Sequence, residues 1–481
     1  MNLLVVVKVL GMLLLCEAVA MLPSLVVALI YGENTVWAFM ISVLITASLG
    51  LLFFKVKVKE NVIRYKEGFA IVTFGWLLAS LMGSLPFLFT GALPSVVDAL
   101  FETISGFTTT GSTVIQDLEV LPKSLLFWRS VTHWLGGMGI LVLALAIQPA
   151  LGVGTFQILK AESPGPISSK LTPRVSGTAK ILYRTYLVIT VVHIILLAVG
   201  GMPIFDSIIH AFGSVSTGGF SLKNASLGAY NNVYFEIVIL IFMILSGINF
   251  SLYYFAFKNK NLRDFFHDTE LKVYLFIIAL YTIIITININ GHVYHSLAES
   301  IRYAAFQVGS VITTTGYVTA NFDLWPDLSK ALIVTLMFVG ACAGSTSGSI
   351  KVIRIHLVFK YIQREINRLV HPRAVKAIKI NNVAVQENIL TNVVSFFMLY
   401  ILIFSFAALV LLTQNLDLVS AVTASAAAIG NIGPGLGLVG PSSSYAALTN
   451  VAKLLLAFLM IVGRLELYTV LSLLFPQTWK A

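Results

Sequence analysis

Charged side chains are scarce in this sequence. Asp, Glu, Lys and Arg together make up 11% of the 481 residues, whereas 58% are apolar. A soluble chain carries about 25% charged residues, so this deficit excludes an ordinary soluble domain. Apolar runs long enough to cross a bilayer, which takes about 20 residues, recur along the chain. The sequence therefore predicts a polytopic membrane protein.

Cysteines and familiar enzyme motifs are also few or missing. Cys16 and Cys342 lie far apart in apolar surroundings, which excludes a disulfide framework and a cysteine metal cluster. No GxxxxGK[ST] pattern is present, so we expect no nucleotide on this chain. HExxH, GxSxG and paired-aspartate signatures are absent, and the eight histidines show no metal-ligand spacing. An intramembrane enzyme is therefore disfavoured.

Ten apolar runs are expected to be transmembrane helices. They lie at 3–30, 35–54, 67–90, 123–149, 178–200, 232–257, 272–290, 328–360, 388–413 and 447–475. An even number places both termini on the same side of the membrane. Ala18-Val19-Ala20 resembles a signal-peptidase site, but apolar residues continue to Ile30, which favours an uncleaved first span.

Basic residues are gathered between the predicted spans. Of the 31 Lys and Arg residues, 22 lie in the connections 55–67, 160–184, 258–272 and 351–379. By the positive-inside rule these connections, and both termini with them, face the cytoplasm. The net charge of +10 therefore reflects topology and does not indicate nucleic-acid binding. The segment 351–379 carries eight cations, so a docking surface and a purely topological signal both remain open there.

Four of the gaps between spans end in related glycine-bearing turns. The gaps are 91–121, 201–231, 291–327 and 414–446. Their turns read FTTTGS, VSTGGF, ITTTGY and IGNIGP, with equivalent glycines at Gly111, Gly219, Gly316 and Gly433. Spacings of 108, 97 and 117 residues indicate an internal repeat. Each repeat is expected to be a span, a short helix, a re-entrant loop and a second span.

The turns have the chemistry of a cation pathway. Irregular backbone is tolerated at membrane depth only where protein buries it or water meets it, and glycine lets carbonyl groups turn towards an axis. Rings of carbonyls can replace the hydration shell of an ion. The expected cation ligands are Thr109, Thr110, Gly111, Thr217, Gly218, Gly219, Thr314, Thr315, Gly316, Asn431, Ile432 and Gly433. A glutamate ring is missing from these turns, which argues against a divalent-cation pore.

Ten small residues, 340–349, interrupt the eighth predicted span. This composition makes a poor helix. We expect a helix break that forms a gating loop, and close helix–helix contact between small residues is the alternative. The candidate gating residues are Gly340, Gly344, Ser345, Thr346 and Gly348.

Arg464 is the sixth gating candidate, because a charge inside an apolar run usually faces a cavity or a partner. A pore-facing arginine is one interpretation, and pairing with Glu466 or snorkelling is the other. Asp98, Glu102, Asp117 and Asp206 either draw cations to the pore mouth or cap the short helices.

The four turns, the 340–349 stretch and Gly463-Arg464-Leu465-Glu466 together resemble the TrkH/KtrB family of potassium-translocating subunits over essentially the whole chain. Two extra N-terminal spans make it more similar to TrkH. The resemblance implies K+ selectivity, a homodimer with one pore per protomer, and a cytoplasmic ring of TrkA-type nucleotide-binding subunits. It also implies the plasma membrane of a bacterium. Asn431 and Ile432 replace threonines of the family pattern, which puts hydroxyl coordination by the fourth turn in doubt.

The expected fold is an all-α polytopic membrane protein with four pseudo-repeats around one central pore. Residues 1–60 hold two extra helices, and the repeats occupy 61–150, 151–260, 261–380 and 381–481. The expected function is K+ translocation through a four-loop selectivity filter, and a K+ symporter coupled to H+ or Na+ is the alternative.

Overall fold

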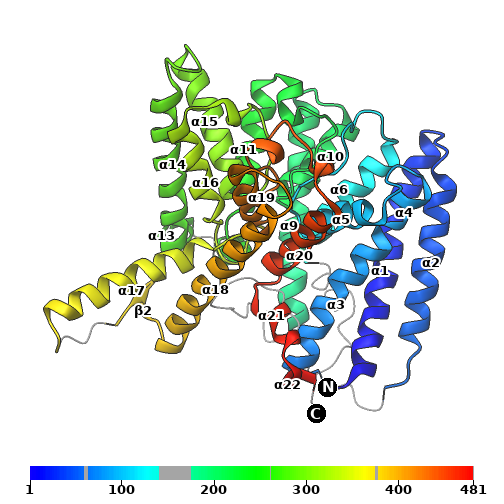
Figure 1. Cartoon of the computed structure of the whole chain (residues 1–481), viewed down its shortest axis with the longest axis horizontal. Helices are drawn as coiled ribbons and strands as arrows, with labels where there is room; N and C mark the ends of the chain where they lie inside the picture. The colour runs from blue at the N-terminus through cyan, green and yellow to red at the C-terminus, as the bar shows by residue number, and fades with distance from the viewer. Residues whose placement is uncertain (59–62, 140–174, 260–261, 374–376, 480–481) are drawn as a thin grey trace.

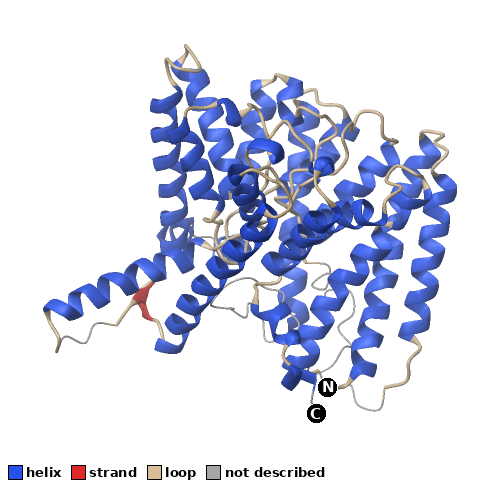
Figure 2. Cartoon of the chain, viewed as in Figure 1, coloured by secondary structure: helices blue, strands red, loops and turns tan. Residues whose placement is uncertain are grey.

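Helices account for nearly all the regular structure (Figure 2). The computed structural model describes residues 1–58, 63–139, 175–259, 262–373 and 377–479. Within these ranges the one sheet is a hairpin of β1 (Lys379–Ile380) and β2 (Val383–Ala384). The all-α fold expected from the sequence is confirmed.

The helices are labelled along the chain as in Figure 1. The α-helices are α1 (Leu3–Ile30), α2 (Val36–Phe54), α3 (Tyr65–Gly83), α4 (Leu85–Phe89), α5 (Val96–Phe107), α6 (Lys123–Gly137), α9 (Val175–Val199), α10 (Ile204–Val215), α11 (Val233–Ser246), α12 (Phe250–Asn259), α13 (Leu262–His267), α14 (Thr269–Ile289), α15 (Leu297–Ile312), α16 (Asp327–Met337), α17 (Val352–Val370), α18 (Glu387–Leu412), α19 (Leu418–Gly430), α20 (Asn450–Arg464), α21 (Tyr468–Leu471) and α22 (Pro476–Trp479). Short 3₁₀ helices are η2 (Ser226–Tyr230), η3 (Phe322–Leu324), η4 (Gly437–Val439), η5 (Tyr445–Ala447) and η6 (Ser472–Leu474).

Six of the ten predicted spans are helices long and apolar enough to cross a membrane: α1, α2, α3 with α4, α9, α14 and α18. Two more are bent pairs, with 86° between α11 and α12 and 108° between α20 and the segment 468–474. The predicted span 123–149 begins as α6, and its end lies outside the described residues. The predicted span 328–360 is interrupted where its small residues indicated a helix break, because α16 ends at Met337 and α17 begins only at Val352.

The two N-terminal helices lie at one side of the molecule (Figure 1). Where α1 crosses α2, a Cβ on Gly11 would lie closer than 3.0 Å to the backbone of α2. Small residues of this kind let membrane helices approach closely. The pair also packs on the body of the protein through contacts of α1 with α3 and α6.

Four short helices of 12–16 residues, α5, α10, α15 and α19, each pack against a helix that precedes them and a helix that follows them in the chain. The packing between successive units forms a closed cycle: α6 packs on α10, α11 on α15, α16 on α19, and α20 returns to α5. In each unit, the helix that follows the short helix therefore also supports the short helix of the next unit. This cycle brings the loops after the four short helices together.

Helix α17 projects from the rest of the chain at the lower left of Figure 1. Its exposed apolar side chains Phe359, Ile362 and Ile366 follow a helical spacing, while basic residues occupy other faces. A continuous transmembrane span does not show this two-sided pattern. The basic segment 351–379 of the sequence is therefore largely an amphipathic helix.

Candidate functional site: four glycine loops and the loop beside them

The four short helices end in loops with the same backbone conformation. We name them loop 1 (108–112), loop 2 (216–220), loop 3 (313–317) and loop 4 (430–434). In each loop the second and fourth residues have positive φ, and the fourth is the glycine identified from the repeat: Thr109 and Gly111, Thr217 and Gly219, Thr314 and Gly316, Asn431 and Gly433. In each loop the third residue donates its backbone N–H five positions back, to a carbonyl near the end of the short helix, over 2.8–3.0 Å. The repeat predicted from the sequence is thus also present in the backbone.

The glycines lie where the loops meet. A Cβ built on Gly111, Gly219, Gly316 or Gly433 would lie closer than 3.0 Å to the carbonyl oxygen of the third residue of the next loop. Those oxygens belong to Gly218, Thr315, Ile432 and Thr110, so the contacts run from loop 1 to 2, 2 to 3, 3 to 4 and back to 1. A side chain at any of these positions would displace a neighbouring carbonyl. The twelve ligand candidates therefore lie together in one closed ring.

Threonine hydroxyls at the ring also support it. In loop 1 the Oγ1 atoms of Thr108 and Thr110 are 2.8 Å apart, and the equivalent pair in loop 3 is 2.7 Å apart. Asn431, which stands in place of a threonine in loop 4, donates from Nδ2 to Thr110 Oγ1 over 3.0 Å and to the Met460 carbonyl over 2.9 Å. Asn431 thereby joins loop 4 to loop 1 and to α20.

The small residues 340–349 form a loop that touches the ring. The Gly348 N–H donates to Thr314 Oγ1 of loop 3 over 2.7 Å, and Thr346 Oγ1 donates to the carbonyl of Val215 at the end of α10 over 3.1 Å. Glu270 Oε1 accepts from Ala343 N over 2.7 Å and from Ile353 N over 3.2 Å. One buried carboxylate of α14 thus holds both the 340–349 loop and the first turn of α17.

Arg464, at the end of α20, connects the 340–349 loop with the end of α6. Its guanidinium donates to the carbonyl of Thr346 over 2.6 Å, and to the carbonyls of Gly136 and Gly137 over 2.6 and 2.8 Å. Glu466 instead pairs with Arg354 of α17 over 2.5 Å. Arg464 also lines a cavity with residues of the 340–349 loop.

The acidic candidates have different surroundings. Asp98, in the first turn of α5, pairs with Lys453 over 2.7 Å, and Asp206, in the first turn of α10, accepts from the Tyr230 hydroxyl over 2.7 Å. Glu102 is buried rather than solvated. Asp117 lies exposed after loop 1, where a hydrogen bond from the Asn224 side-chain amide lowers the pKa of its carboxyl.

Several residues around the ring were missed from the sequence. They are Arg129 and His133 on α6, Glu270 on α14 and Lys351 before α17, all buried. Arg129 lies inside a predicted span. A charge in such a position was the reason to select Arg464, so the same signal could have identified Arg129. Among the described residues, no group of three His, Cys, Asp or Glu side chains could hold a metal ion.

Several known proteins that are similar to this chain are named as potassium transport proteins. Residues 32–478 match the TrkH family, described as cation transport proteins. The chain belongs to the TrkH family. It is 38% identical to the Trk system potassium uptake protein TrkH of Halomonas elongata, covering 100% of both chains. It is also 38% identical to TrkH of Escherichia coli K12, covering 98% of both.

The fold agrees with that of a solved TrkH protein. The crystal structure of the potassium transporter TrkH from Vibrio parahaemolyticus superimposes with a TM-score of 0.90 at 36% identity, covering 100% of both chains. TrkH proteins are multi-pass membrane transporters and not enzymes, so this chain is a membrane transport protein.

Proposed function

We propose that this chain carries K+ across the plasma membrane of a bacterium, the inner membrane if that bacterium is Gram-negative. The ion passes through a selectivity filter made by loops 1–4. The observation that carries this proposal is the closed ring in which each loop glycine faces the carbonyl of the next loop. Carbonyl oxygens replace water around a cation without a fixed charge, so the ion can bind and still leave.

The four short helices favour a cation at the ring. Each ends at its loop, and the partial negative charge at a helix carboxyl terminus lies there. The three threonine-bearing loops and loop 4 differ in side chains but share the backbone conformation. We therefore assign the ion ligands mainly to backbone carbonyls, with threonine hydroxyls as supplementary oxygens in loops 1–3.

The 340–349 loop is proposed to be the gate, with Gly340, Gly344, Ser345, Thr346, Gly348 and Arg464 as gating residues. Its contacts with loop 3, with the end of α10 and with Arg464 support this role. Movement of the loop would require these contacts to break. Shortening the loop is expected to raise K+ flux in the absence of any partner.

We propose a homodimer with both termini in the cytoplasm, where a ring of TrkA-type nucleotide-binding subunits acts on the gate. The basic helix α17 is the candidate docking element, because Arg354 joins it to Glu466 near Arg464. Nucleotide would then act through the partner. Co-purification of the ring with the wild-type chain, lost on charge reversal of exposed α17 residues, is the expected result.

Cation flux in liposomes tests the function. The purified chain, without a partner, is compared for K+, Rb+, Na+ and Li+ at fixed voltage. We expect K+ and Rb+ to pass and Li+ to be excluded, without a need for a proton or sodium gradient. Equal passage of all four ions would refute the filter assignment. Flux that requires a second ion gradient would instead establish the alternative, a K+ symporter coupled to H+ or Na+.

A further inference from the structure

A buried polar side chain lies behind each glycine loop, on the short helix of the same unit. The four are Glu102, His210, Gln307 and Thr423, nine or ten residues before the loop glycine and each 2% exposed or less. Each contacts a residue two or three positions past that glycine, namely Thr113, Ser221, Thr319 and Leu436. The structure thus repeats the same contact four times, between the short helix and the segment that follows the loop. We call each of these contacts a brace.

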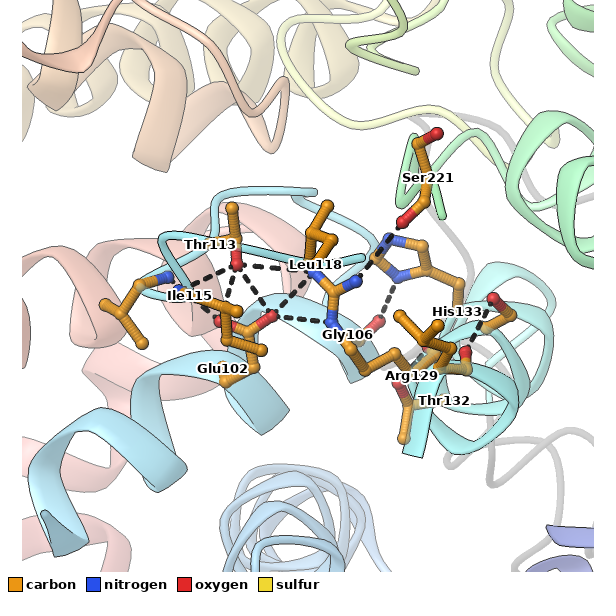
Figure 3. A network of polar contacts seen from close by, with 12 residues as sticks. Glu102, Gly106, Thr113, Ile115, Leu118, Arg129, Thr132, His133 and Ser221 are labelled. Atoms are coloured by element: carbon orange, nitrogen blue, oxygen red, sulfur yellow. Dashed lines mark hydrogen bonds and ion pairs between the residues drawn. The ribbon is translucent and has the colours of Figure 1, made fainter. Parts of the chain in front are cut away.

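The first brace alone among these four positions carries a charge. Glu102 pairs with Arg129 of α6 over 2.7 Å, and both side chains are at most 1% exposed. Thr113 Oγ1 lies 3.0 Å from each oxygen of the carboxylate, and the Val114 N–H donates to Oε2 over 3.0 Å (Figure 3). A buried ion pair is tolerated only when its remaining hydrogen-bonding groups are also satisfied. The pair therefore holds the segment after loop 1 in one position.

Arg129 extends this support to loop 2. Its Nη1 donates to the Ser221 carbonyl over 3.4 Å, and its guanidinium lies 3.9 Å from the centroid of the Phe220 ring. One turn along α6, the His133 ring stacks on the same Phe220 at 4.0 Å, while its Nδ1 lies 2.7 Å from the Gly106 carbonyl. A single face of α6 thus joins α5 and the segment after loop 1 to loop 2.

We propose that Glu102 and Arg129 are positioning residues for cation discrimination, which hold loops 1 and 2 at the separation suited to K+. This inference rests on the proposed function of the ring as a K+ filter. In the cavity-size account of K+ selectivity, smaller ions are rejected because the carbonyls cannot close around them. The other three braces are neutral: His210 and Gln307 each make one such contact, and Thr423 makes two, both with Leu436. Loss of the charged brace is therefore expected to relax the ring most.

The test measures flux of K+, Rb+, Na+ and Li+ in liposomes for the full-length chain and for Glu102→Gln, Arg129→Gln and the double variant. In each variant K+ flux is expected to persist, while the K+/Na+ flux ratio falls by about tenfold, or about 1.4 kcal/mol in discrimination. Glu236→Gln is the matched control. It breaks another glutamate–arginine pair, between the buried Glu236 and the 22% exposed Arg302 at 3.3 Å. That pair makes no contact with loop 1 or 2 in the described network, so the ratio of this variant should stay at that of the wild type.

Each outcome decides one proposal. If the wild-type chain does not discriminate among the ions, the filter assignment is refuted, whatever the Glu102 and Arg129 variants show. A selective wild type whose pair variants keep its ratio, or whose control loses as much, overturns the positioning role. If the charge variants do not fold, Thr113→Val removes the hydroxyl shared by both charges and keeps the pair. Its ratio should fall by a smaller factor, and an unchanged ratio would equally overturn the inference.

Discussion

At the scale of single residues, Gly316 shows why the loops exclude a side chain. Its φ is +80°, and a Cβ would overlap the Ile432 carbonyl of loop 4. Gly316→Ala is therefore expected to lower both K+ flux and the K+/Na+ ratio severalfold, because the added methyl group must push that carbonyl away from the ring. Liposome flux with the four alkali cations measures both quantities.

Gly291→Ala provides the matched control for Gly316→Ala. Gly291 has a φ of +78°, but no atom lies within 4 Å of its Cβ position. An L-residue at such a φ costs about 1–2 kcal/mol, so both variants should lose similar stability. Selectivity loss in Gly291→Ala as well would show that backbone strain, and not crowding at the ring, is responsible.

Arg464 gives a second residue-scale prediction. Arg464→Ala removes donors to three carbonyls that connect the 340–349 loop with the end of α6. A hydrogen bond from a charged group contributes roughly 1.5–3 kcal/mol, and about 1.4 kcal/mol is a tenfold change in an equilibrium. We expect K+ flux without a partner to rise about tenfold. Reduced flux in a normally assembled variant would count against this restraint.

At the scale of elements, the breaks in the helices support one another. The N–H of Cys342 donates to the Gly247 carbonyl, and the N–H of Phe250 donates to the Gly344 carbonyl, each over 3.0 Å. The 340–349 loop therefore satisfies backbone groups freed by the bend between α11 and α12. The small residues at 340–349 predicted the break in that loop. The bend between α11 and α12 was not predicted, and 232–257 was expected to be one continuous span, because the groups that satisfy its free backbone lie about 100 residues away.

Glu270 provides the element-scale prediction. Glu270→Ala leaves the Ala343 and Ile353 N–H groups without their acceptor, and an unsatisfied buried donor costs about 1–3 kcal/mol. The loop should then leave its present position more often, so we expect higher K+ flux without a partner. Glu270→Gln, which keeps an acceptor oxygen, should have a smaller effect in the same liposome assay. Identical flux in the wild type and both variants would show that the contacts of Glu270 do not control the gate.

At the scale of the whole molecule, the closed cycle of packing converts four similar units into one site. Within that cycle we propose the division into two N-terminal helices, residues 1–60, and repeats at 61–150, 151–260, 261–380 and 381–481. The contact of α20 with α5 closes the cycle between the last unit and the first. An ion held at the ring would therefore contact all four units at once.

Ion binding at such a ring should stabilise the whole chain. A ligand that binds only the folded state adds about 2.7 kcal/mol at 100 times its Kd. We expect K+ and Rb+, but not Li+, to raise the Tm of the detergent-solubilised protein at constant ionic strength. Gly316→Ala should lose this difference while Gly291→Ala retains it. A Tm that depends only on ionic strength would contradict a selective site in the ring.

Much of this protein could be predicted from its residues because the signals are local. Apolar length specified most of the spans, and the positions of Gly111, Gly219, Gly316 and Gly433 revealed the repeat. The charge deficit identified the membrane class. Each of these properties depends on a short stretch of chain and on the bilayer, so no distant contact is needed to recognise it.

The tertiary structure decided which distant groups meet. The order of the loops around the ring, the pairing of Glu466 with Arg354 rather than with Arg464, and the Glu102–Arg129 brace all join residues from different helices. In a low-dielectric interior a buried charge must find its partner wherever the packing places one. Sequence spacing identifies the charge, but only the fold selects the partner.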